Sequence, residues 1–198
     1  MSDVTRYAEA EVPTEYGIVR TVVYRAGAAT PAEEHVALVV GPVSDGEAPV
    51  LCRVHSECWT GEVLRSQKCD CREQLDRALR AVSEAGRGVI VYLRQEGRGI
   101  GLGNKVRAYA LQSEGADTVD ANRLLGFADD ARTYGVAADI LRDLGVHSVA
   151  LMTNNPSKVR GLEAGGIEVL ERLALKAEPN PHNAEYLAVK ASKMGHTL

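Results

Sequence analysis

The sequence predicts an α/β (α+β) fold, in which N-terminal antiparallel strands lead into a central sheet covered by helices. Three observations support this prediction. Apolar runs separated by turn residues dominate the first third of the chain. From residue 71 onward the apolar residues recur at helical spacing. Short strands and helices then alternate, an order that is typical of a sheet with helices packed on it.

The first third contains four candidate strands. The stretch EVPTEYGIVRTVVYRA places turn residues 13–17 between two apolar-rich runs, and the runs HVALVVG and APVLCRVHSE follow. Together these strands predict a small antiparallel sheet or a barrel.

Helical spacing begins directly after these strands. Asp70 is placed to cap the first long helix and Gly86 to end it. The buried strand GVIVYLR follows, and a second helix is expected over residues 104–112. The face of this second helix that we expect to pack consists of Val106, Tyr109 and Ala110.

The rest of the chain repeats the alternation. A helix over residues 134–144 ends at Gly145 and leads into the strand HSVALMT. Pro156 then starts a helix that precedes the strand IEVLERL, and a last helix is expected over residues 184–194. The sequence has no internal repeat and no low-complexity linker, so we expect a single domain over residues 1–198.

Composition excludes several classes of function. With 198 residues and 45% hydrophobic content the chain can bury a core. A net charge of -4 provides no global field for DNA or RNA, so any bound phosphate must be held locally. The N-terminus lacks the features of a signal peptide, and no apolar window is long enough to span a bilayer. We therefore expect a cytoplasmic protein with no nucleic-acid or membrane partner.

Three of the four cysteines have a spacing that suits a metal. Cys58, Cys69 and Cys71 form the pattern C-x10-C-x-C, in which a strand end supplies one thiol and the turn before the first long helix supplies two. Three thiolates can converge on one zinc ion. Such a site keeps a fourth position for water and is catalytic in type, whereas a four-cysteine site is closed and structural.

Cys52 decides between these two kinds of site. It lies six residues before Cys58, so the two side chains would share a face on one uninterrupted strand. It also lies in the apolar stretch VLCRV, where a free cysteine behaves as a small buried hydrophobe. The sequence favours three ligands plus water, while a closed four-cysteine site and cysteines without a metal remain as alternatives.

Two segments have the composition of phosphate-binding loops. QEGRGIGLGNK combines four glycines with Arg98 and Lys105 between a strand and a helix, where the backbone can approach an anion. TNNPSK, residues 153–158, offers hydroxyl, amide and ammonium groups where another strand meets a helix. The alternatives are a mobile connection and an ordinary capped helix start. His55 is more typical of a hydrogen-bonded structural histidine than of a metal ligand.

The segments RVHSEC, KCDC, QEGRGIGL, NKVRAYALQ, DTVDAN, LLGFADDAR and TNNPSK, in this order, resemble the GTP cyclohydrolase II family from about residue 53 to the C-terminus. The resemblance implies a homodimeric zinc enzyme that performs the first step of riboflavin biosynthesis. The implied reaction converts GTP to 2,5-diamino-6-(5-phospho-ribosylamino)pyrimidin-4(3H)-one, formate and pyrophosphate, with Mg²⁺ bound to the substrate triphosphate.

The resemblance also implies roles for individual residues. Cys58, Cys69 and Cys71 match the zinc ligands of the family. Asp130 matches the proton acceptor and Arg132 the residue that attacks the α-phosphate. Tyr109 matches a tyrosine close to the reacting purine. Positions that match GTP-contacting residues are Arg53, Val54, His55, Ser56, Glu57, Gln74, Glu96, Gly97, Arg98, Thr118, Thr153 and Lys158.

The chain departs from the family pattern after the C-D-C pair, where the family generally has glycine and this chain has Arg72 and then Glu73. An arginine beside three thiolates could moderate their negative charge or reshape the site. Two alternative functions therefore stay open. One is an enzyme of the same family that stops at a formamidopyrimidine nucleotide, and the other is a non-catalytic zinc module that binds nucleotides or RNA.

Overall fold

The structure is a computed structural model that describes residues 4–27, 33–44, 49–113, 118–128, 130–175 and 180–184. Within these ranges the strands form one seven-stranded sheet with the order β1-β2-β3-β5-β4-β6-β7. The strands are β1 (Val4–Thr14), β2 (Gly17–Ala26), β3 (Glu33–Val40), β4 (Val50–Ser56), β5 (Gly88–Leu93), β6 (Ser148–Met152) and β7 (Glu168–Leu173).

Helices connect and cover these strands. They are α1 (Trp59–Glu62), α2 (Cys71–Ala85), the 3-10 helix η1 (Glu96–Gly99), α3 (Gly101–Ser113), α4 (Thr118–Leu124), α5 (Gly135–Asp143) and α6 (Pro156–Ala164). None of the helices in the described ranges has the length and apolar character needed to cross a membrane.

The sheet is mixed. The strands β1, β2 and β3 pair antiparallel, and β3 continues the antiparallel pairing with β5. In contrast, β4 is parallel to both β5 and β6, and β6 is parallel to β7. The predicted antiparallel N-terminal strands leading into a central sheet are thus confirmed. The barrel alternative is wrong, because β3 joins the central strands and the sheet stays open, with β1 and β7 at its edges.

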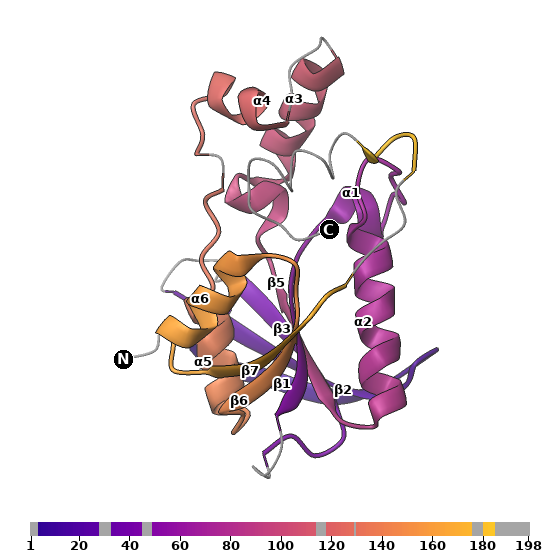
Figure 1. Cartoon of the computed structure of the whole chain (residues 1–198), viewed down its shortest axis with the longest axis vertical. Helices are drawn as coiled ribbons and strands as arrows, with labels where there is room; N and C mark the ends of the chain where they lie inside the picture. The colour runs from indigo at the N-terminus through magenta and orange to yellow at the C-terminus, as the bar shows by residue number, and fades with distance from the viewer. Residues whose placement is uncertain are drawn as a thin grey trace.

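The helices cover both faces of the sheet (Figure 1), with α2 on one side and α5 and α6 on the other. The core consists of two apolar clusters, and β5 contributes residues to both. Ile90 belongs to a cluster with Ala78 and Val82 of α2, whereas Val91 belongs to the larger cluster that includes Ile140 and Leu141 of α5. Successive residues of a strand point to opposite faces, so one buried strand supplies both layers.

The predicted ends of α2 and the predicted start of α6 are confirmed in position. Asp70 occupies the N-cap position of α2, but its side chain makes no capping hydrogen bond and accepts one from the side chain of Gln74 at 2.6 Å. Gly86 follows the last turn of α2 in the left-handed conformation. Asn155 caps α6 by accepting a hydrogen bond from the backbone N–H of Ser157, and Pro156 is the first helical residue.

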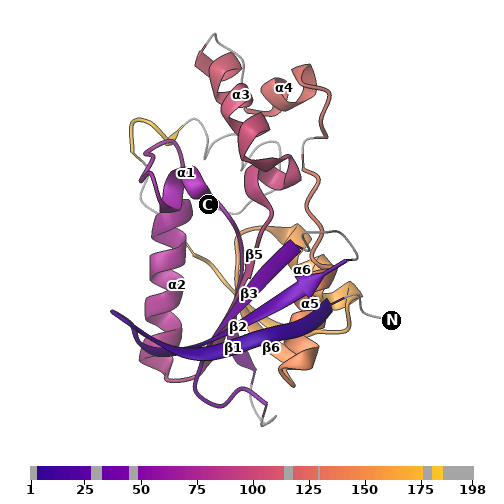
Figure 2. The same cartoon turned by 180° about the vertical axis from the view of Figure 1, so that it is seen from behind.

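The prediction for α3 was wrong in two respects. The helix begins at Gly101, three residues before the expected start at residue 104. Val106 and Ala110, which were expected on a packed face, are exposed, and the buried residue is Ala108. Figure 2 shows the reason: α3 and α4 stand out beyond the end of the sheet and pack on each other. The last expected helix, residues 184–194, lies outside the described residues except for its first position.

Candidate metal centre and nucleotide site

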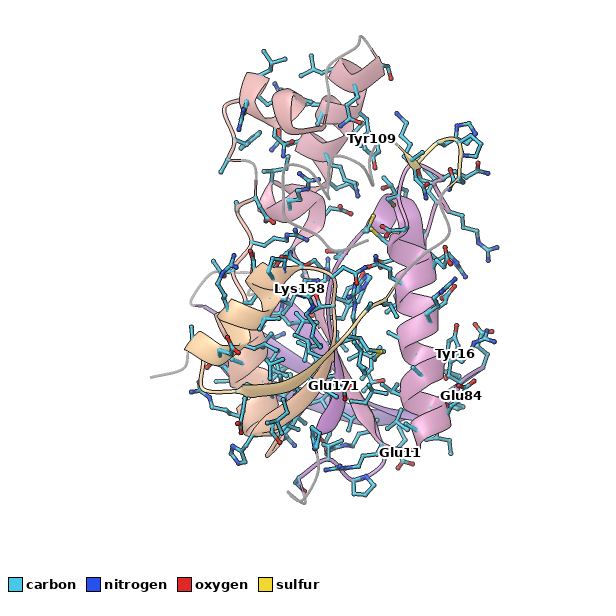
Figure 3. The ribbon with its side chains drawn as sticks, in the orientation of Figure 1. Glu11, Tyr16, Glu84, Tyr109, Lys158 and Glu171 are labelled. Carbon is cyan, nitrogen blue, oxygen red and sulfur yellow. The ribbon has the colours of Figure 1, made fainter. Side chains whose placement is uncertain are left out.

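The parallel strands bring three predicted segments to one edge of the sheet. The carboxyl ends of β4, β5 and β6 lie together because these strands run in the same direction. The segments at or after these ends are residues 53–58, 96–98 and 153–158. In open α/β sheets this edge is where ligands bind. Figure 3 shows Lys158, from the start of α6, near the middle of the molecule, and Tyr109, from α3, above it.

The three predicted metal ligands meet at this edge. Cys58 is the N-cap residue of α1, Cys69 lies in the turn before α2, and Cys71 is the first residue of α2. Their Sγ atoms all lie within 4.8 Å of one another, and the Cys58 and Cys69 sulfurs are 3.7 Å apart. A zinc ion bound tetrahedrally at about 2.3 Å from each sulfur would separate the sulfurs by about 3.8 Å. The donor set and its spacing therefore fit zinc.

Cys52 does not take part in this cluster. Its side chain is fully buried in the apolar core of the sheet, and burial raises the pKa of its thiol to about 12. Among the described residues the group of potential metal ligands consists of the other three cysteines. The prediction that Cys52 is a core residue is confirmed, and the four-cysteine alternative is not supported by this arrangement.

The three thiols differ in the direction in which their surroundings shift the pKa. Hydrogen bonds from Cys69 and Cys71, together with the charge of Lys105, hold the pKa of Cys58 far below its usual range. The hydrogen bond to Cys58 raises the pKa of Cys69 to about 11, and the same partner raises that of Cys71. The Lys105 ammonium, 3.1 Å from the Cys58 sulfur, favours the thiolate, which is the form that binds metals.

Helix α1 places two polar groups around Cys58. The buried Thr60 hydroxyl lies 3.7 Å from the Cys58 sulfur and 3.3 Å from the phenol oxygen of Tyr109. Glu62 accepts a hydrogen bond from the backbone N–H of Cys58 at 3.0 Å. Tyr109, the residue expected near the reacting purine, is therefore linked to the candidate metal ligand Cys58 through the hydroxyl of Thr60. Burial raises the pKa of its phenol to about 12.

Glu62 also fixes the buried His55. The Nε2 atom of His55 lies 2.7 Å from Glu62 Oε1, and the hydroxyl of Tyr92 donates to Glu62 Oε2 at 2.6 Å. Burial lowers the pKa of His55 despite this carboxylate partner. The histidine is thus hydrogen-bonded and lies outside the cysteine cluster, which confirms the structural interpretation made from sequence.

The side chain of Lys105 reaches the candidate metal centre. Its ammonium donates to the Cys58 sulfur at 3.1 Å and to Glu96 Oε1 at 2.7 Å. Burial alone would lower its pKa, but the negative charges of Cys58 and Glu96 raise it, so the side chain stays cationic. The other oxygen of Glu96 accepts the backbone N–H of Trp59 at 2.6 Å. The expected phosphate-loop lysine thus lies against sulfur and carboxylate.

A second group of cations lies along β4 and α6. Arg53 donates to the carbonyl of Met152 and to the side chain of Gln74, and burial lowers its pKa to about 10. Lys158 donates to the backbone carbonyl of Val54 at 2.7 Å, and its ammonium lies 5.8 Å from the ring centroid of Tyr134. These contacts hold two buried positive charges at the carboxyl edge of the parallel strands.

Asp130 and Arg132 form a close ion pair. The guanidinium donates from Nε and Nη2 to the two carboxylate oxygens at 2.8 and 2.6 Å, and the backbone N–H of Arg132 adds a third bond. Burial would raise the pKa of Asp130, but Arg132 lowers it. The backbone N–H of Ala131 donates to the carbonyl of Arg98, so the pair lies beside η1.

The remaining predicted residues take several positions. Ser56 ends β4, and Glu57 accepts a hydrogen bond from Arg94. Gly97 lies in η1 in the left-handed conformation that glycine favours. The Thr153 hydroxyl accepts the backbone N–H of Asn155. Thr118 begins α4, away from the sheet, and its side chain is outside the described part of the structure.

Comparison with known proteins identifies the family. The family model described as GTP cyclohydrolase II matches residues 5–174. GTP cyclohydrolase-2 of Histophilus somni (strain 2336) is 54% identical over 198 residues, covering 100% of this chain and 90% of that protein. The chain belongs to the GTP cyclohydrolase II family. A second member, GTP cyclohydrolase-2 of Azotobacter vinelandii, is 54% identical, and the match covers 96% of this chain and 90% of that protein.

The riboflavin biosynthesis protein RibBA of Bacillus subtilis (strain 168) is 52% identical over 98% of this chain, which spans 48% of that longer protein. The GTP cyclohydrolase II unit thus also occurs as about half of a larger chain.

Two features of this GTP cyclohydrolase II family member were not resolved by sequence reasoning. Arg72 donates to the backbone carbonyl of Glu62, the last residue of α1, and forms an ion pair with Asp76 of α2. Its side chain therefore links the two helices. Thr60 and Glu62 were missed altogether. Both follow Cys58 within four residues, and that proximity to a candidate ligand was the available signal.

Proposed function

We propose that this protein is a GTP cyclohydrolase II, which hydrolyses GTP to 2,5-diamino-6-(5-phospho-ribosylamino)pyrimidin-4(3H)-one, formate and pyrophosphate at the first step of riboflavin biosynthesis. One observation supports this most strongly. Three cysteine sulfurs lie within 4.8 Å of one another in a chain that is 54% identical, over its full length, to a GTP cyclohydrolase-2.

We infer that Cys58, Cys69 and Cys71 hold one zinc ion. Zinc held by these three residues would supply the Lewis acidity that activates water at neutral pH, which is the chemistry needed to open an imidazole ring. Tyr109 is proposed to lie close to the reacting purine and to orient the attacking water, because Thr60 lies between its phenol and the sulfur of Cys58.

The remaining predicted residues are proposed to bind GTP. Arg53 and Lys158 bring buried positive charge to the edge where the strands end, which favours a triphosphate over a neutral nucleoside. Mg²⁺ is proposed to accompany the triphosphate and to neutralise part of its charge. The N-terminus of α6, the positive end of its helix dipole, lies at the same edge.

Release of pyrophosphate is assigned to Asp130 and Arg132. In this proposal Arg132 forms a bond to the α-phosphorus while the bond to pyrophosphate breaks, and Asp130 takes the proton that the guanidinium loses. The two-point hydrogen bonding between them supports this pairing of acceptor and donor. The alternative is that Arg132 stays protonated and stabilises the phosphate charge.

Product analysis separates this function from its two alternatives. Purified zinc-loaded protein is incubated with GTP and Mg²⁺, and formate, pyrophosphate and the pyrimidine are quantified. We expect all three products in equal amounts. Pyrophosphate with a formamidopyrimidine nucleotide but no formate would assign the early-stopping reaction. Zinc-dependent GTP binding without any product would assign the non-catalytic module.

Substitution of single cysteines tests the metal centre. Cys69→Ser is expected to lose zinc and turnover, because a hydroxyl is a far weaker ligand for zinc than a thiolate. Cys52→Ser is the matched control and should keep both, since Cys52 lies in the core. Zinc content by atomic absorption is the measurement. Loss of zinc from Cys52→Ser would restore the four-cysteine site.

We further propose that residues 1–198 act as one domain and that two copies form a homodimer. Family membership supports the homodimer. Size-exclusion chromatography with light scattering would measure the mass in solution, and a value equal to one chain would refute it.

A further inference from the structure

Lys105 is the charged residue of α3 that reaches the metal centre. Its side chain is 13% exposed, and the ammonium contacts Cys58 Sγ at 3.1 Å and Glu96 Oε1 at 2.7 Å. It also lies 5.9 Å from the ring centroid of Tyr109. A single cation thus contacts a candidate metal ligand and a predicted GTP-binding residue, and it lies near the ring of Tyr109.

The charge balance of the cysteine cluster calls for such a cation. Three thiolates around Zn²⁺ leave one net negative charge, and a buried negative charge is costly unless it is paired. The Lys105 ammonium supplies one positive charge at hydrogen-bonding distance from Cys58. An N–H group that donates a hydrogen bond to a ligand sulfur also withdraws electron density from the sulfur and fixes the orientation of the cysteine side chain.

The partners of Glu96 extend this contact into the surrounding loops. Its Oε1 atom accepts the backbone N–H of Gly97 as well as the Lys105 ammonium, and its Oε2 atom accepts that of Trp59. Trp59 is the residue after the ligand Cys58. The Lys105–Glu96 pair therefore joins α3, η1 and α1 around one sulfur.

We propose that Lys105 is a positioning residue of the zinc site, whose ammonium compensates the excess charge of the three thiolates and holds Cys58 and Glu96 together. This inference rests on the proposed zinc chemistry of the same site. The position of Lys105 in a glycine-rich segment suggests that it binds the substrate phosphates. The inference instead assigns Lys105 to the metal site.

The test compares three variants. Lys105→Met keeps the length of the side chain but removes charge and donors, whereas Lys105→Arg keeps both. Arg107→Met removes a charge from an exposed position two residues along α3 and is the matched control. Zinc affinity is measured by competition with a chromogenic chelator. The thiolate-to-metal charge-transfer band is recorded on Co²⁺-substituted protein.

We expect Lys105→Met to bind zinc about 10- to 100-fold more weakly, the effect typical of losing a group that supports a metal ligand. The cobalt band should move to longer wavelength, because a sulfur without its hydrogen bond donates charge more easily. Lys105→Arg should recover most of the affinity and the band position, and Arg107→Met should change neither.

Unchanged zinc affinity and an unchanged cobalt band in folded Lys105→Met would overturn the inference. A raised KM for GTP with both metal readouts unchanged would instead assign Lys105 to the phosphates and also overturn it. If Lys105→Met does not fold by circular dichroism, Lys105→Gln is held to the same two readouts. Wild-type protein that binds zinc but does not convert GTP would refute the proposed function and leave this inference standing.

Discussion

At the scale of single residues, the site is built from charged groups whose partners are fixed before any ligand arrives. Arg132 is held by both oxygens of Asp130, Lys158 by the carbonyl of Val54, and Arg53 by the carbonyl of Met152. A cation fixed in this way loses little conformational freedom when an anion binds. The arrangement favours recognition of a phosphate group at a defined position.

Arg132→Ala separates the two roles proposed for this residue. If Arg132 attacks the α-phosphate first and the nucleotide is processed as a covalent adduct, the variant should release neither pyrophosphate nor formate. We expect this result, because Asp130 is directly paired with the guanidinium and offers the required base. Both products are measured in the same reaction with GTP.

Arg132→Lys is the control for this experiment, since it keeps the charge but not the planar guanidinium. If Arg132 only stabilises phosphate charge, Arg132→Ala should slow pyrophosphate release by about 10²- to 10³-fold while formate still forms. Normal pyrophosphate release from both variants would remove Arg132 from the mechanism.

At the scale of elements, short-range signals predicted what depends on the local chain. The start of α2 and the left-handed Gly86 after it were readable because a capping position and a glycine stop are local features. Helix α1, with four residues, was missed because it is too short to show a period. The packed face of α3 was predicted wrongly because the helix packs mainly on α4 and η1, which periodicity alone does not reveal.

Helix α1, which the sequence analysis missed, packs against the cysteine cluster at Gly61. A Cβ atom at this position would lie 2.9 Å from Cys69 Sγ and 3.2 Å from Cys58 Sγ. Gly61→Ala should therefore push the sulfurs apart and weaken zinc binding by about 10- to 100-fold, the range for disturbed metal surroundings. Zinc affinity by chelator competition is the measurement.

Gly135→Ala is the matched control for this substitution. Gly135 is also helical, and a Cβ atom there would meet nothing within 4 Å. It should leave zinc affinity unchanged. Equal zinc affinity in Gly61→Ala and the wild-type protein would mean that the sulfurs can shift without cost.

At the scale of the whole molecule, the sheet determines which segments meet. Residues 53–58 and 153–158 are far apart in sequence, yet β4 and β6 are neighbours and deliver them to the same edge. Their composition indicated binding loops, but the order β3-β5-β4-β6 depends on long-range pairing that no local pattern encodes. The contact between Lys105 and Cys58 was not predicted for the same reason, because the two residues lie 47 positions apart in sequence.

Long-range contacts also tie the N-terminal hairpin to the helical layer. The Tyr24 hydroxyl donates to Asp143 Oδ2 at 2.7 Å, and Arg6 donates to the same oxygen at 2.7 Å. Tyr24 lies on β2, Arg6 on β1, and Asp143 ends α5. Burial would raise the pKa of Asp143, but hydrogen bonds from Tyr24 and Arg6 lower it.

This lowered pKa predicts a pH-dependent contribution to stability. A carboxyl with a depressed folded-state pKa stabilises the protein above its unfolded value of about 3.9, and the contribution is lost as pH falls through the folded-state pKa. Asp143→Asn should lower the free energy of unfolding at pH 7 by about 1 kcal/mol, a modest value because the ion pair is partly exposed. The difference in unfolding free energy between the variant and the wild type should then shrink as the pH falls below about 4.

Urea denaturation of both proteins across this pH range measures this difference, with Tyr24→Phe as the control that keeps the carboxylate. A difference that stays constant with pH would mean that Asp143 stabilises the fold through shape and not through charge.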